Sequence, residues 1–122
     1  MAVYVGPALL LVRASYRREW TLPGGGIRRG ELPEAAARRE LAEETGIAAT
    51  GLAFAGTACG IWDGRPDRVH FFELHLPDPP ALRPDGREII AAELVPWHRL
   101  DDRALTGSAA AYLTQFANPP RS

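Results

Sequence analysis

Three glutamates in one predicted helix have the clearest chemical potential in this 122-residue chain: Glu40, Glu43 and Glu44. Residues 33–45 are rich in Ala, Leu, Arg and Glu, begin with a proline suited to the first helical position, and precede a glycine. On such a helix the three carboxylates share one face, where like charges destabilise by roughly 0.2–0.5 kcal/mol per pair. A hard divalent cation such as Mg2+ would neutralise this face and bridge it to substrate phosphates.

A solvated surface is the alternative for a glutamate-rich helix face, and the preceding segment argues against it. Gly24, Gly25 and Gly26 form a predicted loop whose backbone can approach a ligand closely. From Gly25 the chain follows the pattern G-x5-E-x7-R-E-U-x-E-E-x-G-U, in which U is an aliphatic residue. A match at so many fixed positions is far more specific than a lone glycine motif. The defined positions are filled by Gly25, Glu31, Arg39, Glu40, Leu41, Glu43, Glu44, Gly46 and Ile47.

This segment resembles the signature box of the Nudix hydrolases, and the likeness extends over most of the chain. The resemblance implies an α/β/α sandwich with a central mixed β-sheet. It also implies that Glu40 and Glu44 bind a metal directly, and that Glu43 does so directly or through water. The carbonyl of Gly24 would be a further ligand. Sequence position alone does not rank the three carboxylates.

The same resemblance implies a clamp between Arg39 and the loop residue Glu31, which would fix the glycine loop to the helix. The loop is long enough to fold back across the distance between these two residues. From the residues alone, Arg39 could equally form an ion pair with Glu43 on the helix surface, and such pairs stabilise little.

The general base that would accept a proton from an attacking water is left open. The resemblance allows a box glutamate, Glu43 or Glu44, or a glutamate from a later loop or strand. Glu88 is the leading choice outside the box because it opens a predicted late strand. A solvated glutamate at the start of a strand is an equal alternative for it. Glu73 and Glu93 are further alternatives.

Arginine is the residue type available for gripping phosphates, because the chain contains no lysine. Arg13 and Arg28 are the predicted substrate contacts. Arg28 stands where many members of the resembled family carry an acidic residue, so it could reach a phosphate or face water. Trp20 could stack on a nucleobase or pack in the core, as such residues more often do.

Composition narrows the class of protein. A length of 122 residues with 46% hydrophobic and 24% charged residues predicts one globular domain, 1–122. The net charge of −1 gives no overall attraction to nucleic acid or an anionic membrane, and no apolar run reaches membrane-spanning length. The single Cys59 excludes an internal disulfide and is predicted to be a buried structural thiol in a cytoplasmic protein.

Alternation and turn residues predict several strands and two helices, hence an α+β fold with a Nudix-like α/β/α arrangement. His70 and His75 fall on opposite faces of one predicted strand, so they cannot jointly bind a metal. Residues 60–67 are rich in Gly, Pro and Asp and predict a loop. The predicted strands are 2–5, 8–13, 20–22, 52–59, 68–76 and 88–95, and the predicted helices are 33–45 and 108–116, the second capped by Ser108.

Together these features predict a hydrolase that depends on Mg2+ or Mn2+ and cleaves the pyrophosphate bond of a nucleoside diphosphate linked to another moiety. The expected partner is a small-molecule nucleotide or nucleoside diphosphate derivative, and neither a nucleic acid polymer nor a membrane is expected. The alternatives are a MutT-like nucleoside triphosphate pyrophosphohydrolase and a non-catalytic nucleotide-binding regulatory domain. A homodimer is compatible with the resemblance, although no residue tests it.

Overall fold

One mixed β-sheet of five strands organises the computed structural model, which describes residues 1–118. The strand order is β3-β4-β1-β2-β5, with β1 parallel to β4 and every other neighbouring pair antiparallel. The elements in chain order are β1 (Ala2–Val5), β2 (Ala8–Ala14), α1 (Pro33–Thr45), β3 (Ala53–Trp62), β4 (Arg65–Leu76), β5 (Ile89–Pro96), the 3-10 helix η1 (Trp97–Asp102) and α2 (Gly107–Gln115).

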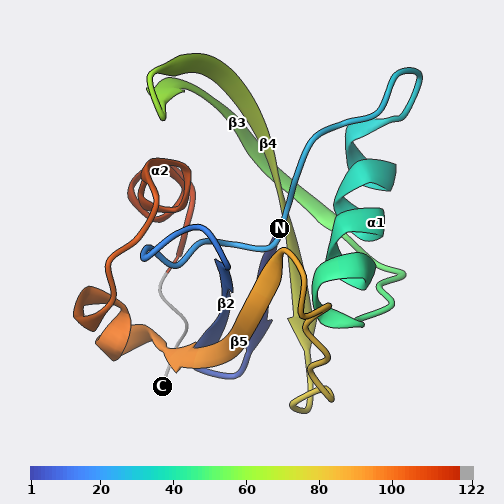
Figure 1. Cartoon of the computed structure of the whole chain (residues 1–122). Coiled ribbons are helices and arrows are strands. Elements are labelled where there is room, and N and C mark those ends of the chain that lie inside the picture. The colour runs from blue at the N-terminus through green and yellow to red at the C-terminus, as the bar shows by residue number, and fades with distance from the viewer. Residues whose placement is uncertain (119–122) are drawn as a thin grey trace.

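The two α-helices cover opposite faces of the sheet, which gives the predicted α/β/α arrangement (Figure 1). One core cluster joins the sheet to α2 and includes Leu9, Leu11 and Tyr112. The other joins the sheet to α1 and includes Leu10 and Leu41. Alternate residues of β2 thus supply both cores, as expected for a strand buried on both faces.

Helix α1 has the predicted bounds. Pro33 is its first residue, and Gly46 ends it in the left-handed conformation with φ 80°, donating its N–H to the carbonyl of Ala42. The side chain of Thr45 also bonds within the helix, donating from Oγ1 to the carbonyl of Leu41 at 2.7 Å. The well-defined end of the helix fixes the direction in which its glutamates project.

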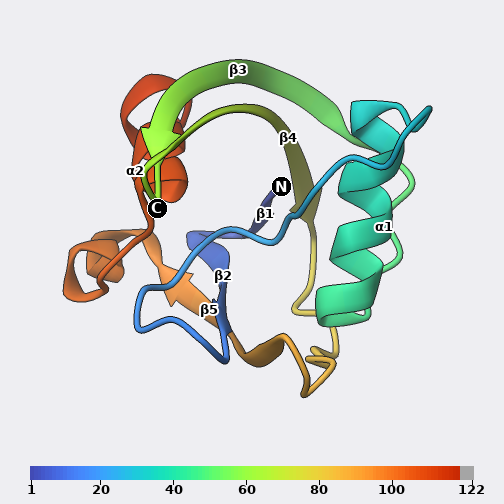
Figure 2. The ribbon, with the colours of Figure 1, turned by 45° about the horizontal axis from the view of Figure 1, so that its top comes forward.

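The predicted loop over residues 60–67 is wrong, because β3 and β4 continue through it as one long hairpin. The turn is only Asp63 and Gly64, both with positive φ (56° and 74°), the combination that suits a two-residue hairpin. Figure 2 shows this hairpin curving from the α1 side over α2. Cys59 lies on β3 at the edge of the sheet and is exposed, so the prediction of a buried thiol is also wrong.

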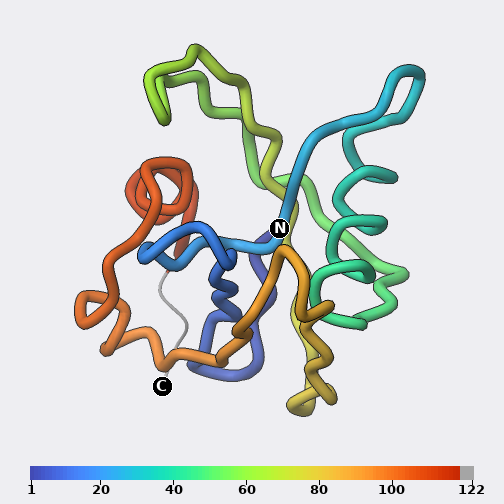
Figure 3. Tube along the Cα trace, viewed as in Figure 1, coloured from blue at the N-terminus to red at the C-terminus, as the bar shows by residue number. Residues whose placement is uncertain are grey.

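Two smaller boundaries also differ from prediction. Residues 20–22 form only isolated bridges, Val12 with Thr21 and Trp20 with Leu105. Helix α2 is capped by Thr106 rather than Ser108, since its side chain accepts a hydrogen bond from the N–H of Ala109. The trace in Figure 3 shows the segment between β2 and α1 passing across the molecule from the α2 side to the α1 side. No helix within residues 1–118 is long and apolar enough to cross a membrane.

Candidate active site

Glu44 is the buried carboxylate of the site, with only 4% of its surface exposed. The backbone N–H of Gly24 donates to its Oε1 at 3.0 Å, which ties the glycine loop to the last turn of α1. Burial, together with the negative charges of Glu40 and Glu88, raises the pKa of Glu44 to about 8, although the hydrogen bond from Gly24 opposes the shift. A cation placed beside Glu44 would therefore relieve an electrostatic penalty.

Glu40 lies directly under the glycine loop. A Cβ atom on Gly25 would come within 2.6 Å of the Glu40 carboxyl carbon, so only glycine fits over this carboxylate as it stands. Nη1 of Arg39 donates to Glu40 Oε1 at 2.7 Å. The loop backbone and two box carboxylates are thereby brought into one small region of the molecule.

The predicted contact between Arg39 and Glu31 is present. Nε and Nη2 of Arg39 each donate to a Glu31 oxygen at 2.9 Å, and Nη2 also donates to the carbonyl of Gly26 at 2.9 Å. Glu31 accepts a further bond from the N–H of Arg28. The Arg39 guanidinium lowers the pKa of Glu31 to about 2, with the Arg28 hydrogen bond adding to the effect. Both ends of the glycine loop are thus attached to α1.

Glu43 is half-exposed and lies 3.5 Å from Nη1 of Arg39 and 3.7 Å from Nη2 of Arg28. Within residues 1–118, no three His, Cys, Asp or Glu side chains converge closely enough to enclose a metal ion. The donor chemistry nevertheless fits a hard cation, because Glu40, Glu43 and Glu44 offer oxygen ligands and the buried Glu44 has no salt-bridge partner among residues 1–118. The exposed Glu43 side chain is free to turn toward such an ion.

Glu88, the candidate base outside the box, is exposed just before β5. Its charge acts on Glu44, which places it on the same side of the molecule as the box. The other two candidates are engaged elsewhere: Glu73 accepts a hydrogen bond from Tyr112, and Glu93 pairs with Arg103 at 2.6 Å.

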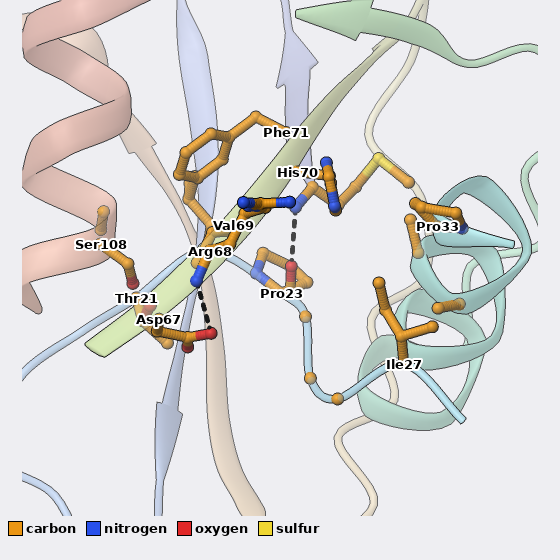
Figure 4. Close-up of a pocket in the computed structure, with 18 residues that line it drawn as sticks. Thr21, Pro23, Ile27, Pro33, Asp67, Arg68, Val69, His70, Phe71 and Ser108 are labelled. Carbon is orange, nitrogen blue, oxygen red and sulfur yellow. Dashed lines mark hydrogen bonds between the residues drawn. The ribbon is translucent and has the colours of Figure 1, made fainter. Parts of the chain in front are cut away.

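A cavity of about 530 Å³ lies beside the glycine loop (Figure 4). Its walls come from the segment Thr21–Ile27, the first turns of α1, the start of α2 and residues 67–71 of β4. Apolar side chains such as Phe71 and Val69 line it together with polar ones from Asp67, Arg68, His70 and Ser108. A mainly apolar cleft with a few convergent polar groups is the usual form of a small-molecule site.

A family model for the NUDIX domain matches residues 2–116. The chain belongs to the Nudix family. This Nudix domain is 49% identical over 53 residues to an RNA pyrophosphohydrolase of Bartonella clarridgeiae, a match that covers 41% of the domain and 31% of the relative. It is 36% identical over 62 residues to diphosphoinositol polyphosphate phosphohydrolase 3-alpha of Mus musculus, covering 51% of the domain and 35% of the relative. The chain spans about a third of the length of these curated relatives.

Solved structures give the same fold over almost the whole chain. A MutT NUDIX hydrolase from Burkholderia pseudomallei is 26% identical with a TM-score of 0.80, and the match covers 95% of this chain and 93% of that one. The NUDIX domain of Shewanella oneidensis NrtR, solved with ADP ribose, has a TM-score of 0.82 at 18% identity, covering 93% and 80%. The second likeness concerns the fold alone.

The three predicted substrate contacts of this Nudix domain do not all meet, because Arg28 lies apart from Arg13 and Trp20. Trp20 is partly buried against the α2-side core, and the guanidinium carbons of Arg13 and Arg103 lie 5.9 and 5.7 Å from the centre of its ring. Arg28 lies at the glycine loop beside Glu43. These residues are not among those that line the 530 Å³ cavity, so their roles in binding stay predictions.

Sequence reasoning did not place the residues of β4 in a cavity beside the glycine loop. Residues alternate along this strand, since Val69 and Phe71 pack toward α2 whereas Phe72 packs toward α1. The missing information was that β4 passes next to the glycine loop, more than forty residues earlier in the chain. Because residues 60–67 were predicted to form a loop, Asp67 was not assigned to the strand, although it lies on β4 where the cavity wall begins.

Proposed function

We propose that this Nudix domain is a Mg2+- or Mn2+-dependent hydrolase that cleaves the pyrophosphate bond of a nucleoside diphosphate linked to another moiety. The observation that carries the proposal is the buried carboxylate of Glu44, held by the N–H of Gly24 at a loop that also lines the cavity. One loop thus joins the carboxylates to the place where a substrate would lie.

Glu40, Glu43, Glu44 and the carbonyl of Gly24 are the groups that would hold the metal. When bound, the metal supplies charge neutralisation at the phosphoryl oxygens and a water of lowered pKa. In the hydrolysis one water molecule would add across the pyrophosphate, so that its oxygen bonds to one phosphorus and the bridging P–O bond breaks. The electron pair of that bond passes to the departing phosphate, and a carboxylate takes the proton of the water.

Glu44 and Glu88 are the leading candidates for the proton acceptor, with Glu43 as the third. Glu44 is held rigidly by Gly24, and its raised pKa makes it a stronger base than an ordinary carboxylate. A metal ion next to Glu44 would lower that pKa again and engage its carboxylate, which leaves the exposed Glu88 as the candidate outside the metal site. The products are two phosphorylated compounds, one from each side of the bond.

The remainder of the substrate would lie in the 530 Å³ cavity, where Phe71 and Val69 offer apolar surface to a base. The clamp between Arg39 and Glu31 holds the glycine loop, and therefore one wall of this cavity, against α1. The names of the matched relatives, a pyrophosphohydrolase and a diphosphoinositol polyphosphate phosphohydrolase, support cleavage between phosphates.

A second candidate is a nucleoside triphosphate pyrophosphohydrolase of the MutT type. The observation that favours it is the near-complete mutual coverage, at 26% identity, with the Burkholderia MutT NUDIX hydrolase. The two candidates differ in their products. A triphosphate would give a monophosphate and pyrophosphate, whereas a linked diphosphate would give two phosphorylated organic products.

The test is product analysis by chromatography after incubation with Mg2+ or Mn2+. The panel contains nucleoside triphosphates, nucleotide sugars, ADP-ribose, NADH, dinucleoside polyphosphates and an RNA with a 5′-triphosphate. Glu44→Gln should lower turnover by about two orders of magnitude or more while the protein stays folded. Glu34→Gln is the matched control, because Glu34 lies on the first turn of the same helix and pairs with Arg38 on the surface. Full activity of Glu44→Gln would contradict the site, and binding without turnover by the unmodified protein would favour the regulatory domain.

A further inference from the structure

We propose that Arg68 and His70 bind a phosphate group of the substrate that lies beyond the two phosphates of the scissile bond. The inference rests on the proposed hydrolase function and adds a substrate class to it. The class is a pyrophosphate compound with at least one additional phosphate, either further along the phosphate chain or attached elsewhere on the nucleoside.

The two side chains share one face of β4 and one cavity. Residues two apart on a strand project from the same face, so Arg68 and His70 lie together, opposite Val69 and Phe71. Both line the cavity with Pro33 of α1, and both are drawn at its centre in Figure 4. The cavity therefore has a cationic part on the α1 side of β4.

Arg68 has a free guanidinium. Within the described part of the chain no carboxylate lies within 4.0 Å of it, whereas Arg39 and Arg103 are tied to glutamates. An arginine fork binds two phosphate oxygens at once, and the bond is strengthened by charge. Arg68 is thus available for an incoming anion.

Asp67, the acidic residue of the cavity lining, indicates on which face of β4 a phosphate would bind. Asp67 accepts a hydrogen bond at 2.7 Å from the backbone N–H of Arg68, but it belongs to the opposite face of β4 together with Val69. Its negative charge would repel a phosphate from the α2 side of the strand. The anion is therefore directed to the face that carries Arg68 and His70.

His70 is held in one orientation by the neighbouring strand. Thr57 is its cross-strand partner, and Oγ1 of Thr57 lies 2.9 Å from Nδ1 of His70. A hydroxyl can donate to a bare ring nitrogen or accept from a protonated one, so this bond survives in either state of the ring. Within residues 1–118 the other nitrogen, Nε2, has no hydrogen-bond partner, so it can donate to a phosphate oxygen.

Two pairs of substrates distinguish the possible sources of the additional phosphate. ATP differs from ADP by one phosphate in the chain, and NADPH differs from NADH by one phosphate on a ribose. The measured quantity is kcat/KM with Mg2+, expressed within each pair as a preference for the member with the extra phosphate. A substitution that only disturbs the structure lowers kcat/KM equally for both members of a pair and leaves the preference unchanged.

We expect the unmodified protein to prefer the phosphate-rich member of at least one pair by about tenfold or more, as for a charge-assisted contact. Arg68→Gln and His70→Phe should each reduce that preference several-fold, mainly through KM, and Thr57→Val should reduce it less. Arg65→Gln is the matched control, since Arg65 is an exposed arginine of the same strand outside the cavity lining. A preference in the ATP pair alone identifies a chain phosphate, and one in the NADPH pair alone identifies a ribose phosphate.

Equal kcat/KM within both pairs, or an unchanged preference in Arg68→Gln, would overturn the inference. If no compound is hydrolysed, the proposed function fails and calorimetry decides the inference separately. In that case about tenfold weaker binding of ATP or NADPH, but not of ADP or NADH, to Arg68→Gln than to the unmodified protein would support it. Equal changes in affinity within each pair would overturn it.

Discussion

The backbone N–H of Gly24 and the carboxylate of Glu44 form a 3.0 Å hydrogen bond that connects the glycine loop to the buried end of α1. The bond stabilises the charged form of Glu44, whereas burial opposes that form and prevails, raising the pKa to about 8. The same loop carries Gly25 over Glu40 and lines the cavity. A substitution at Glu44 or in the loop should therefore alter the positions of the box carboxylates and also the shape of the cavity.

The first prediction concerns stability against pH without metal. Below pH 4.5, the ordinary value for this group, Glu44 is protonated in the folded and the unfolded chain and has no effect. Between pH 4.5 and about 8 only the folded state keeps the proton, so the free energy of unfolding falls as pH rises. Above about pH 8 Glu44 is ionised in both states, so the free energy of unfolding no longer falls on its account. Thermal unfolding in EDTA from pH 5 to 8.5 should show this decline in the unmodified protein and a smaller one in Glu44→Gln.

Metal addition should reverse the effect of pH. A metal binds the deprotonated carboxylate, so the rise in Tm caused by Mg2+ should be larger at pH 8 than at pH 6. Parallel pH profiles for the unmodified protein and Glu44→Gln, or a Mg2+ effect independent of pH, would count against the assignment of Glu44.

The second prediction uses two neighbouring glycines of the loop. In Gly25→Ala the new methyl group would lie 2.6 Å from the Glu40 carboxyl carbon, so this carboxylate must move. Displacing a catalytic group by about 1 Å can lower turnover by up to about 100-fold, and we expect a loss of roughly 10- to 100-fold here. Gly26→Ala is the control, because its Cβ would meet no atom within 4 Å. Steady-state kinetics would compare the two, and similar activities would show that Glu40 is misassigned.

The third prediction tests the clamp. Arg39→Lys keeps the charge but loses the planar fork that reaches Glu31 and Gly26 together. Hydrogen exchange of the loop amides should become faster, and activity should fall by about tenfold because the loop positions both the carboxylates and the cavity wall. Arg38→Lys is the matched control at the preceding residue. It affects only an exposed ion pair with Glu34 and a hydrogen bond to the carbonyl of Thr50. Equal rates of hydrogen exchange at the loop amides in the two variants would show that the contact between Arg39 and Glu31 does not hold the loop.

Local signals in the sequence predicted α1 and the first two strands well. The proline at the start, the glycine at the end and the apolar run of β2 each act through neighbouring residues, and the structure has the expected bounds or nearly so. The same reliance on local signals failed at residues 60–67, where a glycine, a proline and an aspartate lie within paired strands. Pairing along the long hairpin outweighed their individual preference for turns.

In the candidate site, too, features set by nearby residues were predicted, whereas features set by long-range contacts were not. The shared face of the box glutamates follows from their spacing on one predicted helix, and the clamp was expected from the resemblance to the Nudix box. The cavity depends on β4 lying beside the glycine loop, which is a long-range arrangement set by the parallel pairing of β1 with β4. The position of Arg68 and His70 in a cavity beside the glycine loop therefore emerged only with the structure, as did the position of Trp20 outside the cavity lining.

The fourth prediction concerns the attachment of α2 to the sheet. The hydroxyl of Tyr112 is fully buried, lies 2.5 Å from that of Tyr4, and also donates to Glu73. Tyr112→Phe would leave both partners without this bond, so the free energy of unfolding should fall by about 1–3 kcal/mol. Urea unfolding measures the change, with the exposed Tyr16→Phe as a control expected to stay within about 0.5 kcal/mol. Equal stabilities would show that the network contributes little.

The most direct test of the central proposal is the metal dependence of product formation from one linked nucleoside diphosphate, such as ADP-ribose. With Mg2+ the account predicts two phosphorylated products in equal amounts, none after EDTA, and full recovery when Mg2+ is restored. Glu44→Gln should form little product in the presence of Mg2+. Hydrolysis that continues in EDTA, or nucleotide binding without hydrolysis of any compound in the panel under Mg2+ or Mn2+, would contradict the proposal.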